Sequence, residues 1–156
     1  MRSPAPWLFA LVYGLHLLDE GLLPPGLARW ANDLGYPFSP EHWLAVSSAS
    51  FVLFSAAVWL VARRTWPSWV LVALATHIGL HGLAHLGASV WAGSVSPGML
   101  TGLLLALPLS VWTFRWGQQA LDRKLLVRSA LVGAATFQVP WDLMIRLAFG
   151  LEIWVA

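Results

Sequence analysis

The sequence predicts an all-α membrane protein, a polytopic helical bundle of about five transmembrane helices that forms a single domain over residues 1–156. Of its 156 residues, 58% are hydrophobic and only 10% are charged, whereas about 25% of the residues in a soluble domain are charged. The mean hydropathy is +0.69. A chain with so few charges cannot cover its surface with polar groups, so we expect it to lie in a lipid bilayer, with membrane lipids as partners.

Five apolar stretches are long enough, or nearly so, to cross a hydrocarbon core of about 30 Å, which takes roughly 17–25 helical residues. These predicted spans cover residues 7–23, 43–62, 69–90, 99–116 and 126–149. Tryptophan residues stand near the ends of several of them. The amphipathic indole ring prefers the headgroup layer of a bilayer, so these positions support the proposed boundaries.

The longest connection, residues 24–41, is expected to lie on the outer side of the membrane. Prolines and glycines flank its middle part, residues 27–34, in which apolar residues recur at helical spacing and leave a charged side. This pattern predicts an amphipathic helix that lies in the membrane interface.

The basic residues indicate the orientation of the chain. With five spans, the side of the membrane that holds the N-terminus also holds seven of the nine basic residues: Arg2, Arg63, Arg64, Arg115, Arg123, Lys124 and Arg128. The opposite side holds only Arg29 and Arg146. The positive-inside rule therefore predicts a cytoplasmic N-terminus and an external C-terminus. These loops also account for the sequence pI of about 9.7, and no basic stripe points to a nucleic-acid partner.

The chain contains no cysteine. This excludes disulfide bonds, thiolate metal sites and iron–sulfur clusters. Any bound metal ion must therefore be held by imidazole, carboxylate or water oxygen.

Five ionisable residues interrupt two of the predicted spans: His16, Asp19 and Glu20 in the first, and His81 and His85 in the third. An ionisable side chain at membrane depth costs roughly 2.5–3.5 kcal/mol on the translocon scale, so such a group indicates a functional site. Residues three or four apart lie on one face of a helix. Each set therefore points to one side of its own helix.

The two sets are also expected to lie at a similar depth. Both helices run outward from the cytoplasm, and at about 1.5 Å per residue Glu20 and His81 each lie roughly 18–20 Å above the start of their stretches. On the same scale His16 pairs with His77 about one turn lower. Asp142 falls in the same outer half. The spacing thus predicts a polar chamber between helices, and leaves open whether His77 and Asp142 belong to it.

A family resemblance supports this grouping. The segment His16-Leu17-Leu18-Asp19-Glu20 resembles the signature of the HXXEE family of small membrane proteins, with Asp19 in place of the first glutamate. In the family's downstream pattern a polar residue such as asparagine stands four positions before a histidine, and a Pro-Gly pair opens the next helix. The residues that resemble it here are His81, which replaces the asparagine, His85, Ser96-Pro97-Gly98, Thr101 and Pro108. The resemblance implies membrane residence but no particular activity.

The leading hypothesis is a metal-dependent membrane enzyme that acts on a lipid-soluble substrate. His16, Glu20 and His85 are the predicted ligands of a divalent ion, either zinc, iron or manganese, because these metals accept imidazole and carboxylate. Asp19 and His81 would complete a second metal site, act as acid or base, or position the ligands. Hydrolysis, oxidation and isomerisation all stay open, as does assembly into a homo-oligomer.

Two alternatives use the same residues differently. In the first, the column formed by His77, His81 and His85 with the two carboxylates is a pathway for protons or metal ions. In the second, His16 and a histidine of the third span bind a haem in an electron carrier. Adjacent carboxylates would place negative charge beside an apolar macrocycle, which argues against the haem.

Overall fold

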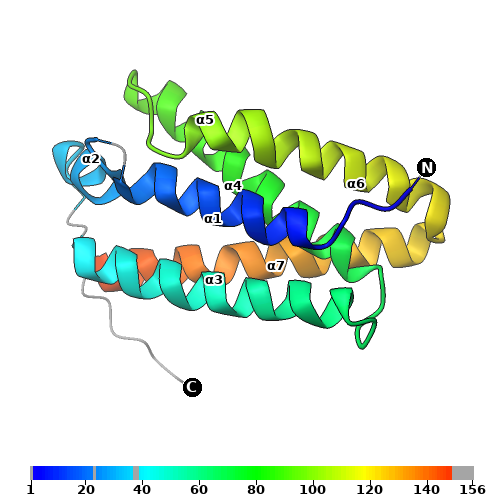
Figure 1. The fold of residues 1–156 in the computed structure, drawn as a ribbon. Coiled ribbons are helices and arrows are strands. Elements are labelled where there is room, and N and C mark those ends of the chain that lie inside the picture. The colour runs from blue at the N-terminus through cyan, green and yellow to red at the C-terminus, as the bar shows by residue number, and fades with distance from the viewer. Residues whose placement is uncertain (1, 23, 37–38, 149–156) are drawn as a thin grey trace.

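In a computed structural model the chain folds into a bundle of helices (Figure 1). The structure describes residues 2–22, 24–36 and 39–148, and for residues 138–148 it describes the backbone alone. Within these ranges all regular elements are helical, which confirms the all-α prediction. The elements are α1 (Trp7–Leu22), α2 (Leu27–Asp33), α3 (Pro40–Ala62), α4 (Val70–Ala92), α5 (Met99–Thr101), η1 (Gly102–Ala106), α6 (Leu107–Ala120) and α7 (Arg123–Ala148).

The long helices run back and forth through the bundle. Helices α1, α4 and α7 point in one direction, and α3 and the continuous rod formed by α5, η1 and α6 point in the other (Figure 1). Helix α4 contacts all of these helices and is the central one. In its most apolar 18-residue segment 61% of the residues are buried, compared with 28% for α3. The core around α4 includes Phe9, Val58, Val72, Ala75 and Ile78.

Three helices in the described part of the chain are long and apolar enough to cross a membrane: α3, α4 and the rod Met99–Ala120. The predicted count of about five is therefore wrong. Helix α1 has only 16 residues and buries Asp19 and Glu20. Helix α7 has 26 residues, but its sequence includes Arg123, Lys124 and Arg128 and is much less apolar overall. Both helices pack beside the three candidate spans, but α1 lacks the length that a span needs and α7 lacks the apolar character.

Local hydrogen bonding and backbone conformation explain where α3 begins and where α4 ends. Helix α3 begins at Pro40, three residues before the predicted span, because the Ser39 hydroxyl accepts a hydrogen bond from the His42 backbone N–H at 3.1 Å. Proline suits the first turn, where its missing N–H costs nothing. Helix α4 ends at Gly93, which adopts a left-handed φ of 63° that glycine tolerates best. The helix expected in the long connection is α2, and its position relative to a membrane stays a prediction.

The backbones of α4 and η1 touch at a pair of glycines. A Cβ atom on Gly82 would lie 2.9 Å from the Gly102 carbonyl oxygen, and one on Gly102 would lie 2.7 Å from the Gly82 Cα atom. Element η1 is a turn of π-helix, and Pro108 follows it. A proline lacks an N–H and its ring clashes with the carbonyl oxygen four residues earlier, which explains a widened turn here. This contact holds the segment just before η1 against α4.

We expect the substitution Gly82→Ala to destabilise the bundle, because the added methyl group meets backbone atoms that cannot move separately. Overpacking of this kind costs about 1–3 kcal/mol. Gly87→Ala in the same helix is the control, since a Cβ there meets nothing within 4 Å and alanine favours a helix. Thermal unfolding of the detergent-purified proteins should show a lower midpoint for Gly82→Ala only. Equal midpoints for the two variants would contradict the close contact.

Candidate metal centre

Three imidazole rings converge on one carboxylate oxygen. Glu20 Oε1 lies 2.6 Å from His85 Nε2, 3.2 Å from His81 Nε2 and 3.3 Å from His16 Nε2. These four atoms all lie within 4.8 Å of one another, so the group could hold a metal ion. With zinc–nitrogen bonds of 2.0–2.1 Å, neighbouring ligand atoms of a tetrahedral site are about 3.3 Å apart. The two longer contacts have this spacing.

The group is buried, although not uniformly. The side chains of His16, Glu20 and His85 are 3%, 2% and 2% exposed, whereas His81 is 12% exposed. A buried carboxylate must be compensated by positive charge or by hydrogen bonds. Among the described residues the groups that face Glu20 Oε1 are imidazoles. His81 is the member of the group nearest to the outside.

A hydroxyl group fixes the orientation of the His16 ring. The Thr101 hydroxyl donates to Asp19 Oδ2 at 2.7 Å, and the Thr101 backbone N–H donates to the same oxygen at 3.2 Å. Because its single proton is committed to the carboxylate, Thr101 Oγ1 accepts from His16 Nδ1, 2.9 Å away. A proton on Nδ1 leaves a lone pair on Nε2. His16 Nε2 is buried and makes no hydrogen bond in the described chain.

His85 is oriented in the same manner by Ser96. The Ser96 hydroxyl lies within hydrogen-bond distance of the Pro97 carbonyl oxygen, at 3.2 Å, and of His85 Nδ1, at 2.9 Å. Ser89 fixes this segment in turn, since its hydroxyl accepts from the Ser96 backbone N–H at 2.8 Å and donates to the His85 carbonyl at 2.7 Å. Both imidazoles thus face the carboxylate oxygen with Nε2, and His85 Nε2 forms a hydrogen bond with it at 2.6 Å. Either a proton on an imidazole or a metal ion can join these atoms.

The second oxygen of Glu20 is held from α3. Trp43 Nε1 donates to Glu20 Oε2 at 3.3 Å. The indole ring lies directly against α1 at Gly21, where a Cβ atom would collide with it. Glycine at this position is therefore what lets the indole reach the carboxylate.

Gly98 closes the centre from the side of α5. Its φ of 88° is left-handed, and a Cβ atom there would lie 2.9 Å from Glu20 Cγ, 3.0 Å from His16 Cε1 and 3.1 Å from His85 Cε1. Any other residue would be strained by its backbone and would push into three members of the centre. The segment that carries Ser96 and Thr101, formed by the loop before α5 and by α5 itself, can come this close only because Gly98 has no side chain.

The structure brings together most of the residues singled out in the sequence. His16, Glu20 and His85 meet as expected, and His81 joins the same cluster of nitrogen and oxygen atoms. Asp19 lies beside the cluster and reaches it through Thr101.

Glu20 lies level with His81 as expected, but the expected pairing of His16 with His77 was wrong by about one helical turn. The His16 ring lies opposite His81 and His85, with ring centroids 4.8 Å and 5.0 Å apart, rather than opposite His77. The His77 ring lies beside the cluster, 6.3 Å from that of His81. The side chains of Asp142 and Arg146 lie outside the described residues.

Sequence reasoning assigned no role to four residues that shape the centre. Ser96, Gly98 and Thr101 belong to the family pattern, which marked them without indicating that they touch the histidines. Trp43 was interpreted as an interfacial ring because it stands near the end of an apolar stretch. No local pattern separates a tryptophan that lies in the headgroup layer from one that donates to a buried carboxylate, so only the packing of α3 on α1 reveals it.

The comparison with known protein families gave a match that includes the residues of the centre. Comparisons with curated proteins and with solved structures gave no match. The family described as "Protein of unknown function with HXXEE motif" matches residues 7–113. The matched region contains all four members of the centre and the loop that orients them. The chain therefore belongs to the HXXEE family, and the motif's histidine and second acidic residue are two of the groups that meet in the centre.

Proposed function

We propose that this protein is an integral membrane protein that holds a divalent metal ion in its buried centre and acts on a lipid-soluble substrate. One observation carries the proposal: three imidazole nitrogens surround a single buried carboxylate oxygen at 2.6–3.3 Å. The hydroxyls that orient His16 and His85 support it, because partners that fix the tautomer are typical of metal-binding histidines. The three candidate spans support the membrane location.

His16, Glu20 and His85 are the proposed ligands, and the position of His81 Nε2 adds a fourth donor. With three protein ligands, zinc keeps an open position for water or substrate. With four, an open position remains only for a metal of higher coordination number, such as iron or manganese. His81 therefore decides which metals can be catalytic here, and as the most exposed of the four it is the one that substrate reaches first.

A metal ion in this centre would supply a Lewis acid or an activated water. The chain itself supplies the surroundings. Asp19 acts through Thr101, because its carboxylate holds the hydroxyl that orients His16. If His81 is not a ligand, its Nε2 is well placed to hold or release a proton next to the bound substrate. Hydrolysis, oxidation and isomerisation are all compatible with these roles.

The geometry favours this proposal over the two alternatives. Glu20 Oε1 lies within 3.3 Å of both His16 Nε2 and His85 Nε2, which leaves no space for a planar haem between the two imidazoles. The column His77, His81 and His85 has consecutive ring contacts and resembles an ion pathway. Below His77, however, the space between α3, α4 and α7 is lined mainly by apolar side chains, so the polar column ends there.

We also propose an orientation in which the basic end of the bundle faces the cytoplasm. The N-terminus and the turns that join α3 to α4 and α6 to α7 lie at the same end (Figure 1). These segments, the last two turns of α6 and the start of α7 carry six basic residues: Arg2, Arg63, Arg64, Arg115, Arg123 and Lys124. The positive-inside rule then places the N-terminus in the cytoplasm. Helix α7 runs toward the opposite end, and we propose an external C-terminus.

Metal content tests the proposed ligands. Detergent-purified wild-type protein should contain a stoichiometric transition metal by elemental analysis. Each of His16→Ala, Glu20→Ala and His85→Ala should contain far less, because a ligand and its charge are lost. Thermal stability should fall in parallel, since a ligand that binds only the native state stabilises it.

His42→Ala is the matched control for these variants, because His42 is exposed on α3 and lies outside the cluster. It should keep the metal content and the thermal stability of the wild type. An unchanged metal content in Glu20→Ala would refute the proposed metal site. A wild-type protein that holds no metal after gentle purification would refute it as well.

The hydroxyl of Thr101 provides a second test. In Thr101→Val the shape is kept, but His16 Nδ1 loses its acceptor and Asp19 loses a donor, so we expect metal affinity to fall about 10–100-fold. Thr76→Val is the matched control, because the Thr76 hydroxyl bonds only the Val72 carbonyl of its own helix, at 2.8 Å. Competition with a chelator measures both affinities. Equal affinities would show that Thr101 does not orient a ligand.

The orientation can be tested with single cysteines, since the chain has none of its own. Ser68 lies in the turn between α3 and α4, Ser94 lies in the loop after α4, and both are exposed. A membrane-impermeant maleimide should label Ser94→Cys in intact cells and Ser68→Cys only after lysis, because the two positions lie at opposite ends of a candidate span. Labelling of Ser68→Cys alone in intact cells would reverse the orientation.

A further inference from the structure

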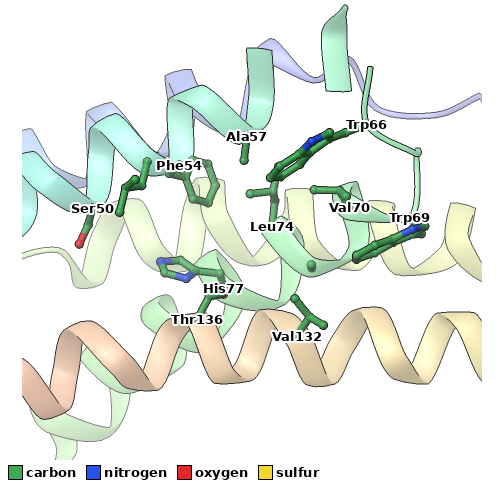
Figure 2. Close-up of a pocket in the computed structure, with 12 residues that line it drawn as sticks. Ser50, Phe54, Ala57, Trp66, Trp69, Val70, Leu74, His77, Val132 and Thr136 are labelled. Carbon is green, nitrogen blue, oxygen red and sulfur yellow. The ribbon is translucent and has the colours of Figure 1, made fainter. Parts of the chain in front are cut away.

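An apolar groove of about 490 Å³ lies between α3, α4 and α7. Its volume is within the range of about 300–1,000 Å³ that is usual for small-molecule sites. Figure 2 shows Trp66 and Trp69 toward one end and Ser50, His77 and Thr136 toward the other. Leucine, valine, alanine and phenylalanine side chains line the space between these ends.

The polar end of the groove lies next to the candidate metal centre. His77 lines the groove, and its ring centroid lies 6.3 Å from that of His81, the most exposed member of the centre. Tyr13 and Phe137 contact both of these imidazoles, with centroids 5.6–6.1 Å apart. His77 is therefore the boundary between the groove and the centre.

The depth, length and lining of the groove indicate which kind of molecule it can bind. Helices α3 and α4 are two of the three candidate spans, so in a bilayer the groove lies at the depth of the acyl chains. Along α4 it extends from Trp69 to His77, which is about 12 Å of helix. A hydrocarbon chain matches both the lining and this elongated form, and the polar groups at one end only match a molecule with a single polar end.

We propose that this groove binds the hydrocarbon chain of the lipid-soluble substrate, with the substrate's polar end at His77 and its terminal methyl group near Trp66 and Trp69. The inference rests on the proposed function, and it names the substrate class as a single-chain amphiphile. The polar end of the chain then points at His81 and the metal centre. Van der Waals contact of the chain with the apolar lining holds that end in place.

Photolabelling tests the groove and the direction of its occupant. Two decanoic acid analogues, whose extended chains match the length of the groove, are used: one with a diazirine near the methyl end and one with a diazirine near the carboxyl end. Each is irradiated with the intact protein in lipid nanodiscs, and the adducts are mapped by mass spectrometry. The methyl-end probe should label residues close to Trp66 and Trp69, and the carboxyl-end probe should label residues close to His77. The reverse order, or adducts spread evenly over the exposed apolar faces, would overturn the proposal.

Neighbouring residues provide matched variants. Ala57 lines the groove, whereas Ala56, the residue before it in the same helix, is exposed and does not line the groove. Ala57→Phe should abolish groove labelling because the ring fills the space, and Ala56→Phe should leave it unchanged. Val132→Phe and Leu131→Phe form an equivalent pair on α7, because Val132 lines the groove and Leu131 does not, although both side chains are exposed, at 44% and 64%. If Ala57→Phe fails to fold, this second pair tests whether the groove is the site of labelling. Equal labelling within a pair would refute the groove.

Metal content of the same preparations separates this inference from the proposed function. Bound metal together with an unlabelled groove would refute the groove inference alone. Directional labelling of the groove in a protein without metal would support a hydrocarbon site and refute the metal-dependent function. Ala57→Phe should retain full metal content, because Ala57 lies on α3, away from the four members of the centre.

Discussion

The burial of the Glu20 carboxylate among three imidazoles is the constraint on which the rest of this structure depends. Removing an ionised carboxylate from water costs several kcal/mol even after relaxation, so the fold must surround it with donors or cations. Helix α4 provides two of the imidazoles at adjacent turns, and α1 provides the third one turn before Glu20 itself. Helix α3 adds the indole N–H of Trp43. The central position of α4 follows from this requirement.

The loop between α4 and α5, together with α5 itself, holds the side chains of the centre in place. The hydroxyls of Ser96 and Thr101 fix two of the imidazole rings, and Gly98 lets the backbone between them approach the rings closely. This approach depends in turn on the contact of Gly82 with Gly102, which brings the start of η1 onto α4. Small residues at a helix interface thus influence the orientation of imidazole rings several ångströms away.

Helix α4 contributes to a polar region and to an apolar region at different points along its length. Toward its C-terminal half α4 presents His81 and His85 to the centre, and toward its N-terminal half it lines the apolar groove. His77 belongs to the boundary between the two regions. The proposed function requires both regions to be in contact, because the substrate's chain must stay in a hydrocarbon environment while its polar end meets the centre.

By itself the sequence determined the helical class, a polar cluster built around His16, Glu20 and His85, and the absence of thiol ligands, since composition and the 3.6-residue period depend only on the order of residues. Tertiary structure decided the rest. The number of candidate spans fell to three because α1 is short and α7 is charged. His16 meets His81 and His85 rather than His77 because the relative shift of two helices is set by packing, here by contacts such as those of Gly98 and Trp43, and not by residue spacing along either helix.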